Sequence, residues 1–212
     1  MSTEKEYTLH YFDGIMVRAE PVAMLLAHAK VPFEYTRIAM ADWPTLKANF
    51  PNGQIPMLVC KDGSKLSQSN SILRFLGIKY GYYPKDAMDA FRCDELCDLY
   101  LDILPKIYTP FFKKTDEERK EMYPNIFDVI LPNFLKQIEE RCKDGFLVGD
   151  SLSICDFWIG GLYTNFFANP NIGFGKEHWD ACLAKFPAFK AYGERFAEVN
   201  KAWISTRQVA AI

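Results

Sequence analysis

The sequence lacks the features that mark several large classes of protein. Its formal net charge is only −2, so no long-range field favours nucleic acid or an anionic membrane. No apolar run approaches the roughly 20 residues that a membrane-spanning helix needs. The first residues, MSTEKEY, are polar and do not have the pattern of a signal peptide. We therefore expect a cytoplasmic protein that binds neither nucleic acid nor a membrane.

The chain also lacks a paired cysteine motif. Its six cysteines form no CxxC pair, and its three histidines are scattered along the sequence. Cys93 and Cys97 stand close together in a predicted helix, at a spacing that suits neither a redox dithiol nor a zinc knuckle. We expect no metal site, and we expect the cysteines to be ordinary packed thiols of a reducing compartment.

The first third of the chain alternates strand and helix patterns. Apolar residues make up 49% of the 212 residues, enough for the core of one large or two small domains. Residues 7–12 and 32–38 have strand patterns, and residues 17–30 between them have a helix pattern. A hairpin with its turn at residues 62–63 precedes a helix over residues 69–80. The intervening helix requires the first two strands to be parallel.

Strand patterns end at a linker over residues 81–87. Ser153 and Asp156 have the spacing of a helical capping box. Pro105 is expected to kink or end the helix that contains it. Helices are predicted over residues 89–108, 122–142, 153–168 and 187–199. The sequence therefore predicts an α/β domain over residues 1–83, followed by an all-helical domain over residues 84–212.

Two features of the hairpin region have more than one interpretation. Pro56 stands at the mouth of a predicted strand, where it can simply begin an edge strand. Ser69 stands where a helix begins and can serve as its N-cap. Alternatively, Pro56 and the polar run of residues 68–71 both face a ligand. The residues alone leave both interpretations open.

Five segments resemble the cytosolic glutathione S-transferases of the tyrosine type, within the mu, pi and sigma group and closest to sigma. The segments are LHYF with RAE shortly after it, ADWPTLK, GQIPML, LSQSNSILRFLG and FLVGDSLSICDF. They follow the family's order over nearly the whole chain. The resemblance implies a thioredoxin-like N-terminal domain that binds glutathione, and a C-terminal helical bundle that lines the pocket for the electrophile.

The resemblance assigns the centre of the glutathione site to the hairpin region. Pro56 would follow a cis peptide bond, which would leave the N–H and C=O groups of Ile55 to pair with the cysteinyl part of glutathione. Ser69 and Gln68 would bind the γ-glutamyl end, where the start of a helix supplies further N–H donors.

The resemblance assigns the glycine end of glutathione to the irregular segment before the hairpin. Trp43 and Lys47 would donate to the glycine carboxylate through the indole N–H and the ammonium group. Gln54 would line the same pocket. Without the resemblance, Trp43 would be interpreted as a core aromatic and Lys47 as a solvated surface residue.

Three aspartates, Asp94, Asp98 and Asp102, form a stripe along one helix. Such a stripe is ordinarily a solvated face, because like charges at this spacing repel. The resemblance implies instead a homodimer in which Asp102 reaches the γ-glutamyl amine bound to the partner subunit. It also implies that Asp94 pairs with Arg74 across the interface.

The resemblance makes Tyr11 the catalytic residue. A tyrosine hydroxyl with a pKa near 10 remains protonated at neutral pH and can donate to the thiolate of glutathione. Arg18 would reinforce Tyr11, although an ion pair between Arg18 and Glu20 is almost as well supported by the sequence. A cysteine-type transferase is excluded because no cysteine stands near residues 11–16.

The implied activity is conjugation of glutathione, as a co-substrate, to hydrophobic electrophiles in detoxification. By position, Phe12, Thr109, Phe112 and Ile212 would line the electrophile pocket. The alternatives are a non-catalytic ligandin or crystallin-like relative, and a prostaglandin isomerase. Thr109 stands where the isomerase has a tryptophan, which weighs against that specialisation. The sequence does not indicate the natural electrophile.

Overall fold

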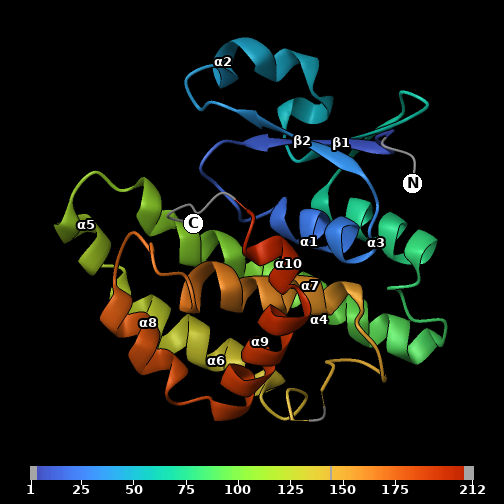
Figure 1. Cartoon of the computed structure of the whole chain (residues 1–212). Coiled ribbons are helices and arrows are strands. Elements are labelled where there is room, and N and C mark those ends of the chain that lie inside the picture. Colours follow the sequence, from blue (N-terminus) through green and yellow to red (C-terminus); the bar gives the residue numbers. More distant parts are fainter. Residues whose placement is uncertain (1–3, 144, 208–212) are drawn as a thin grey trace.

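The computed structural model describes residues 4–143 and 145–207. Its fold is a thioredoxin-like unit with a four-stranded mixed sheet, followed by an all-helical unit. The sheet unit lies above the helical unit in Figure 1. Helix α3 of the sheet unit ends at Tyr80 and helix α4 of the second unit begins at Ala87.

The sheet has the strand order β2-β1-β3-β4. Strands β1 (Tyr7–Phe12) and β2 (Phe33–Ile38) are parallel, as the sequence predicted, while β3 (Met57–Cys60) and β4 (Lys65–Ser67) add antiparallel pairs. Burial alternates along β1, so that Tyr7, Leu9 and Tyr11 point into the core. The alternation brings Tyr11 to the inner side of the strand, at its carboxyl end.

Helices cover both faces of the sheet. Helices α1 (Glu20–His28) and α3 (Ser69–Tyr80) lie between the sheet and the helical unit (Figure 1). Helix α2 (Trp43–Leu46) lies on the opposite side, and the 3-10 turns η1 (Lys47–Asn49) and η2 (Pro51–Gly53) follow it.

The helical unit is built around helix α7 (Ile154–Leu162), every residue of which is buried. The elements before it are α4 (Ala87–Tyr108), η3 (Thr109–Phe112), α5 (Asp116–Lys120), the π-helical η4 (Pro124–Ile130) and α6 (Leu131–Ile138). Those after it are the π-helical η5 (Tyr163–Phe167), α8 (Lys176–Leu183), α9 (Pro187–Val199) and α10 (Lys201–Ile204).

Helices α7 and α9 approach each other closely through glycines. A methyl group added to Gly160 of α7 would overlap the ring of Phe196 on α9. Conversely, a methyl group added to Gly193 of α9 would overlap the ring of Tyr163, which directly follows α7. Each helix therefore accommodates an aromatic ring of the other at a residue without a side chain.

The predicted capping box at the start of α7 is present. The Asp156 carboxylate accepts from the Ser153 N–H at 2.8 Å and from the Ser153 hydroxyl at 2.9 Å. It also accepts from the Leu147 N–H at 3.1 Å and from the Tyr192 hydroxyl at 2.9 Å. Because these donors surround a carboxylate that is fully buried, the motif is structural.

The helices differ from the sequence predictions in three respects. Helix α4 continues through Pro105 to Tyr108, because a proline removes one N–H donor without ending a helix that is packed along its length. The helices predicted over 122–142 and 153–168 each contain a π-helical stretch. Helices α5, α8 and α10 were missed, although Thr115 and Glu118 form a capping box that is visible in the sequence.

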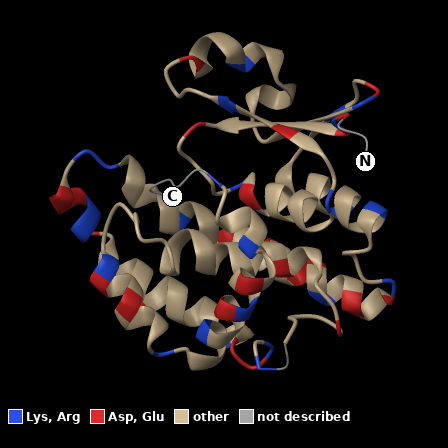
Figure 2. Cartoon of the chain, viewed as in Figure 1, with Lys and Arg blue, Asp and Glu red and all other residues tan. Residues whose placement is uncertain are grey.

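The surface carries charges of both signs, as the small net charge suggests, and the cysteines are unpaired thiols. Basic and acidic side chains are interspersed over the helical unit (Figure 2). All six cysteines are free, and all but Cys60 are buried. No helix within residues 4–143 and 145–207 combines the length and the hydrophobicity that crossing a bilayer requires.

Candidate active site

A cleft of about 420 Å³ opens between the sheet unit and the end of helix α4. Aromatic and aliphatic side chains share its walls with a few polar groups, which is the usual composition of a small-molecule site. From the sheet unit it is lined by Tyr11, Phe12, Ile15, Val17, Arg18, Met40, Trp43, Gly53, Gln54, Ile55, Pro56, Gln68 and Ser69. From α4 and η3 it is lined by Tyr108 and Phe112.

Tyr11 stands at the inner wall of this cleft with 5% of its surface exposed. Its hydroxyl oxygen accepts a hydrogen bond from the Arg18 backbone N–H at 3.3 Å. Burial raises the pKa of Tyr11 to about 12, although the Arg18 N–H acts in the opposite direction. The hydroxyl therefore keeps its proton at neutral pH and can donate it to an acceptor in the cleft.

Arg18 also lines the cleft, at the turn that leads into α1. The sequence left open an ion pair between Arg18 and Glu20. In the structure Glu20 pairs with Arg207 instead, at 2.9 Å, because the start of α1 directs this carboxylate away from the cleft and towards the C-terminal helix. The Arg18 side chain is half-buried beside Tyr11, where its positive charge lowers the pKa of the phenol.

The residues predicted for the glycine end of glutathione lie on the segment from α2 to η2. Trp43 lines the cleft and packs edge-on against Phe12, with ring centroids 5.2 Å apart. Gln54 lines the cleft as well. Lys47 is exposed and is not a lining residue, but its methylene chain runs directly across Gly53, which is one. The ammonium group is therefore close to the edge of the cleft.

The peptide bond between Ile55 and Pro56 is cis, which confirms the expectation drawn from the family resemblance. Both residues line the cleft. Ile55 stands before the first residue of β3 and outside the register of paired strands. The sheet ladder therefore does not use the N–H and C=O groups of Ile55.

Gln68 and Ser69 meet the cleft at the start of α3. The sequence allowed Ser69 to be a plain N-cap, but Gln68 occupies the N-cap position and Ser69 is the first helical residue. No side chain accepts a capping hydrogen bond there, so the N–H groups of this first turn face the cleft without a side-chain cap. Gln68 has a positive φ of 71°, unusual for a non-glycine residue, and its amide donates to Gln54 at 3.3 Å.

The predicted electrophile pocket is only partly assembled from the expected residues. Phe12 and Phe112 line the cleft, but Thr109 does not, because its hydroxyl donates back to the Pro105 carbonyl at 2.5 Å. Ile212 lies outside the described residues. Tyr108 lines the cleft and was missed, although it stands one helical turn before Phe112 in the sequence.

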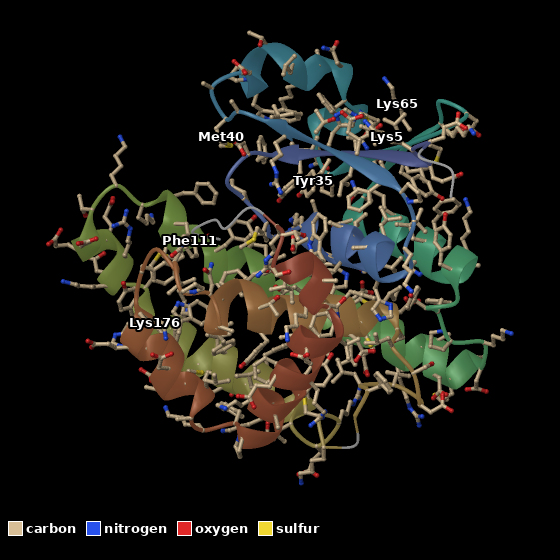
Figure 3. The ribbon with its side chains drawn as sticks, viewed as in Figure 1. Lys5, Tyr35, Met40, Lys65, Phe111 and Lys176 are labelled. Atoms are coloured by element: carbon tan, nitrogen blue, oxygen red, sulfur yellow. The ribbon has the colours of Figure 1, made fainter. Side chains whose placement is uncertain are left out.

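Met40 and Phe112 form the mouth of the cleft. They come from the two different units and are 50% and 55% exposed. Figure 3 shows Met40 on the sheet unit, across from the helical segment that carries Phe111. Neither Ile15 nor Met40 was predicted, because short irregular segments give no periodicity from which to judge the direction of a side chain.

The acidic stripe on α4 does not reach the cleft of its own chain. Asp94 accepts from Arg74 of the same chain at 2.9 Å, so the two residues that were predicted to pair across an interface also pair within one chain. Helices α3 and α4 are neighbours within one chain, so these two groups meet without a second copy. Asp98 accepts from Asn70 at 2.8 Å, and Asp102 is exposed.

The polar groups of the cleft are mostly hydrogen-bond donors. Among the described residues, no group of three or more His, Cys, Asp or Glu side chains is placed to hold a metal. The cleft instead gathers N–H and O–H donors at Arg18, Trp43, Gln68 and Ser69. These donors fit a ligand with carboxylates at both ends, and the hydroxyl of Tyr11 is available near the middle.

Known families and structures match over most of the chain. A model described as the N-terminal domain of glutathione S-transferases matches residues 7–77, and one described as a C-terminal domain of the same enzymes matches residues 101–207. Glutathione S-transferase 4 of Caenorhabditis elegans is 34% identical over 180 residues, which cover 81% of this chain and 85% of that protein.

Two further matches extend the comparison. An S-crystallin of Nototodarus sloanii is 32% identical over 163 residues, which cover 75% of this chain and 79% of that protein. The crystal structure of a nematode-specific glutathione S-transferase of Caenorhabditis elegans superposes with a TM-score of 0.79 at 31% identity. That superposition covers 99% of this chain and 100% of the other.

Proposed function

Because this chain belongs to the glutathione S-transferase family, we propose that it conjugates glutathione to hydrophobic electrophiles and that the Tyr11 hydroxyl holds the reacting sulfur as a thiolate. The observation that carries the proposal is the buried phenol at the inner wall of the cleft. Burial raises its pKa to about 12, so at neutral pH it is a hydrogen-bond donor and not a base.

The size of the effect is sufficient for the chemistry. A free thiol has a pKa of about 8.5 and is mostly protonated at pH 7, whereas the thiolate is the nucleophile. A hydrogen bond to a charged group contributes about 1.5–3 kcal/mol, and one pKa unit corresponds to about 1.4 kcal/mol. One hydroxyl can therefore lower the thiol pKa by about one to two units. The Arg18 N–H strengthens this donor, because an oxygen that accepts one hydrogen bond donates the next one better.

We assign the two ends of glutathione to the two ends of the cleft. The γ-glutamyl carboxylate would accept from Ser69 and Gln68 at the N-terminus of α3, where no side chain caps the N–H groups. The glycine carboxylate would accept from Trp43 and Lys47. In the middle, the N–H and C=O groups of Ile55, which the sheet does not use, would pair with the cysteinyl residue.

We further propose that two copies pair through α3 and α4. Large apolar side chains are exposed on both helices: Phe75 and Ile78 on α3, and Met88 and Phe91 on α4. Such a patch is expected to be covered by a partner. Asp102 is exposed on α4 and does not line the cleft of its own chain, so it can bind the γ-glutamyl amine only across such an interface.

The thiol pKa of bound glutathione tests the proposed role of Tyr11. We expect Tyr11→Phe to raise that pKa by about one to two units, measured from thiolate absorbance during a pH titration of the complex. Tyr7→Phe is the matched control, because Tyr7 lies on the same strand and its hydroxyl contacts Lys79 rather than the cleft. An equal thiol pKa in the wild-type and Tyr11→Phe proteins would rule Tyr11 out as the activating group.

The alternative is a non-catalytic binding protein, since an S-crystallin is among the similar proteins. Both functions need the cleft to bind glutathione, so binding alone does not separate them. Turnover of chlorodinitrobenzene does. A protein that binds glutathione with the wild-type geometry but fails to conjugate a panel of aryl halides and peroxides would favour the alternative.

A further inference from the structure

A buried ion pair joins the start of helix α1 to the C-terminal segment. The Glu20 carboxylate and the Arg207 guanidinium are 2.9 Å apart, and their side chains are only 1% and 8% exposed. The two residues are separated by 187 positions in the sequence. A surface pair of this kind would contribute little, but removing one partner of a buried pair leaves an uncompensated charge.

The same two groups bind three further residues, which lie in two elements of the helical unit. The Glu20 oxygen that accepts from Arg207 also accepts from the Trp203 indole N–H of α10, at 2.8 Å. Arg207 donates in addition to the Asn165 side chain at 2.8 Å and to the Thr164 carbonyl at 3.0 Å, both in η5. The pair therefore fixes the start of α1 against two elements of the helical unit.

The start of α1 is also the segment that contacts the Tyr11 hydroxyl. The Glu20 N–H donates to the Met16 carbonyl at 2.8 Å, which closes a turn over residues 16–20. Arg18 is the middle residue of this turn, and its N–H is the group that donates to Tyr11 at 3.3 Å. Glu20 thus anchors one end of the turn that presents this N–H.

Helix α10 also packs against β2, the strand that pairs with the one that carries Tyr11. Trp203 stacks on Tyr35 of β2, with ring centroids 6.5 Å apart. Tyr35 lies on the side of the sheet that faces the helices (Figure 3). Tyr35 belongs to β2, which pairs directly with β1. In this pairing Arg37 of β2 lies opposite Tyr11. Trp203 of α10 therefore contacts both Glu20, at the end of the turn that contains Arg18, and Tyr35, on the strand next to β1.

We propose that Glu20, Arg207 and Trp203 are positioning residues for catalysis: they hold the turn over residues 16–20 so that the Arg18 N–H stays on the Tyr11 hydroxyl. This inference rests on the proposed role of Tyr11. The C-terminal segment then sets the pKa of the bound thiol although it does not touch glutathione. If these residues only stabilised the fold, replacing them would lower the stability of the protein and leave the thiol pKa unchanged.

The experiment uses the full-length protein with glutathione and compares the thiol pKa of the complex with the pH profile of kcat/KM for chlorodinitrobenzene. We expect Arg207→Met to raise the thiol pKa by roughly half a unit to one unit, because the hydrogen bond from Arg18 to Tyr11 is weakened. Trp203→Phe removes the indole N–H and shortens the ring but keeps an aromatic side chain, so it should shift the thiol pKa less and in the same direction. It also keeps the test available if Arg207→Met does not fold.

A double variant separates charge from geometry. Arg207→Met alone leaves the Glu20 carboxylate buried without its partner, and Glu20→Gln removes that charge. The double variant should therefore melt at a higher temperature than Arg207→Met alone. Its thiol pKa should remain raised, because the anchor of the turn is still missing. Return of the thiol pKa to the wild-type value in the double variant would contradict the positioning role.

The control is Arg195→Met. Arg195 ties α9 to the Cys142 carbonyl at 2.8 Å, far from the turn, so its loss should lower the melting temperature without moving the thiol pKa. If Tyr11→Phe raises the thiol pKa while Arg207→Met and Trp203→Phe leave it unchanged, the positioning role is overturned and Tyr11 keeps its role. If Tyr11→Phe has no effect either, both proposals are overturned.

Discussion

The Trp158 indole N–H donates to the Asn70 side-chain oxygen at 2.8 Å, and this bond joins the buried helix α7 to the first turn of α3. The Asn70 amide in turn donates to Asp98 of α4 at 2.8 Å. Asn70 directly follows Ser69, so the helical unit determines where the first turn of α3 meets the cleft. The same turn is proposed to bind the γ-glutamyl carboxylate.

We expect Asn70→Ala to weaken glutathione binding and to lower the free energy of unfolding by about 1–3 kcal/mol, because the Trp158 N–H loses its acceptor inside the protein. Urea unfolding and the KM for glutathione measure the two effects. In a Trp158→Phe background the indole donor is absent, so Asn70→Ala should cost less stability there. Equal costs in the two backgrounds would show that the hydrogen bond does not couple the residues.

Asp156 predicts a pH dependence of stability. Burial raises its pKa to about 6, above the ordinary value of 3.8. Between these two pH values the folded state therefore keeps a proton on Asp156 that the unfolded state has released. Stability from this group is therefore present below pH 3.8 and is lost as the pH rises to about 6, by up to about 3 kcal/mol.

The matched variant for this prediction is Asp156→Asn, which has the same shape and does not titrate. Its unfolding free energy should have a constant offset from lost acceptors, while the wild-type protein loses stability relative to it as the pH rises through this window. Urea unfolding at several pH values measures the difference. A difference that stays flat with pH would mean that Asp156 titrates at its ordinary value despite its burial.

Two adjacent glycines of α7 should respond oppositely to alanine. A methyl group on Gly160 must displace the buried Phe196 ring, whereas at Gly161 the nearest atom is the flexible end of Met24 at 3.4 Å. We expect Gly160→Ala to cost about 1–3 kcal/mol or more through overpacking. Gly161→Ala should be neutral or stabilising by up to about 1 kcal/mol, because alanine favours the helix. Melting temperatures that fall equally would disprove the steric argument.

Pairing through α3 and α4 predicts a dimer that one charge can dissociate. Phe91 is 60% exposed within the proposed patch, so Phe91→Asp would bury a carboxylate at the interface and should shift sedimentation towards the monomer. The control is Val199→Asp, since Val199 is 51% exposed on α9, away from the patch. Asp102→Asn should then raise the KM for glutathione only in the paired state. A wild-type protein that sediments as a monomer would contradict the shared site.

Local patterns predicted the elements whose ends are marked by strong signals. The strand over residues 7–12 and the helices over 69–80 and 187–199 have the predicted bounds, because periodicity and flanking glycine or proline agree there. Long-range contacts were not predictable in this way. Nothing near Glu20 in the sequence indicates Arg207 as its partner, and which of the neighbouring residues Tyr108 and Thr109 faces the cleft depends on how α4 packs.

The exposed residues at the mouth of the cleft have a consequence for how such a protein diversifies. Met40 and Phe112 contribute little to folding, since both are about half exposed, Met40 in a turn and Phe112 at the end of η3. A lineage can therefore exchange these two side chains for larger, smaller or charged ones and admit other compounds without rebuilding the scaffold. The surroundings of Tyr11 have less freedom, because the Arg18 N–H that contacts its hydroxyl lies on a turn whose last residue, Glu20, is bound to Arg207.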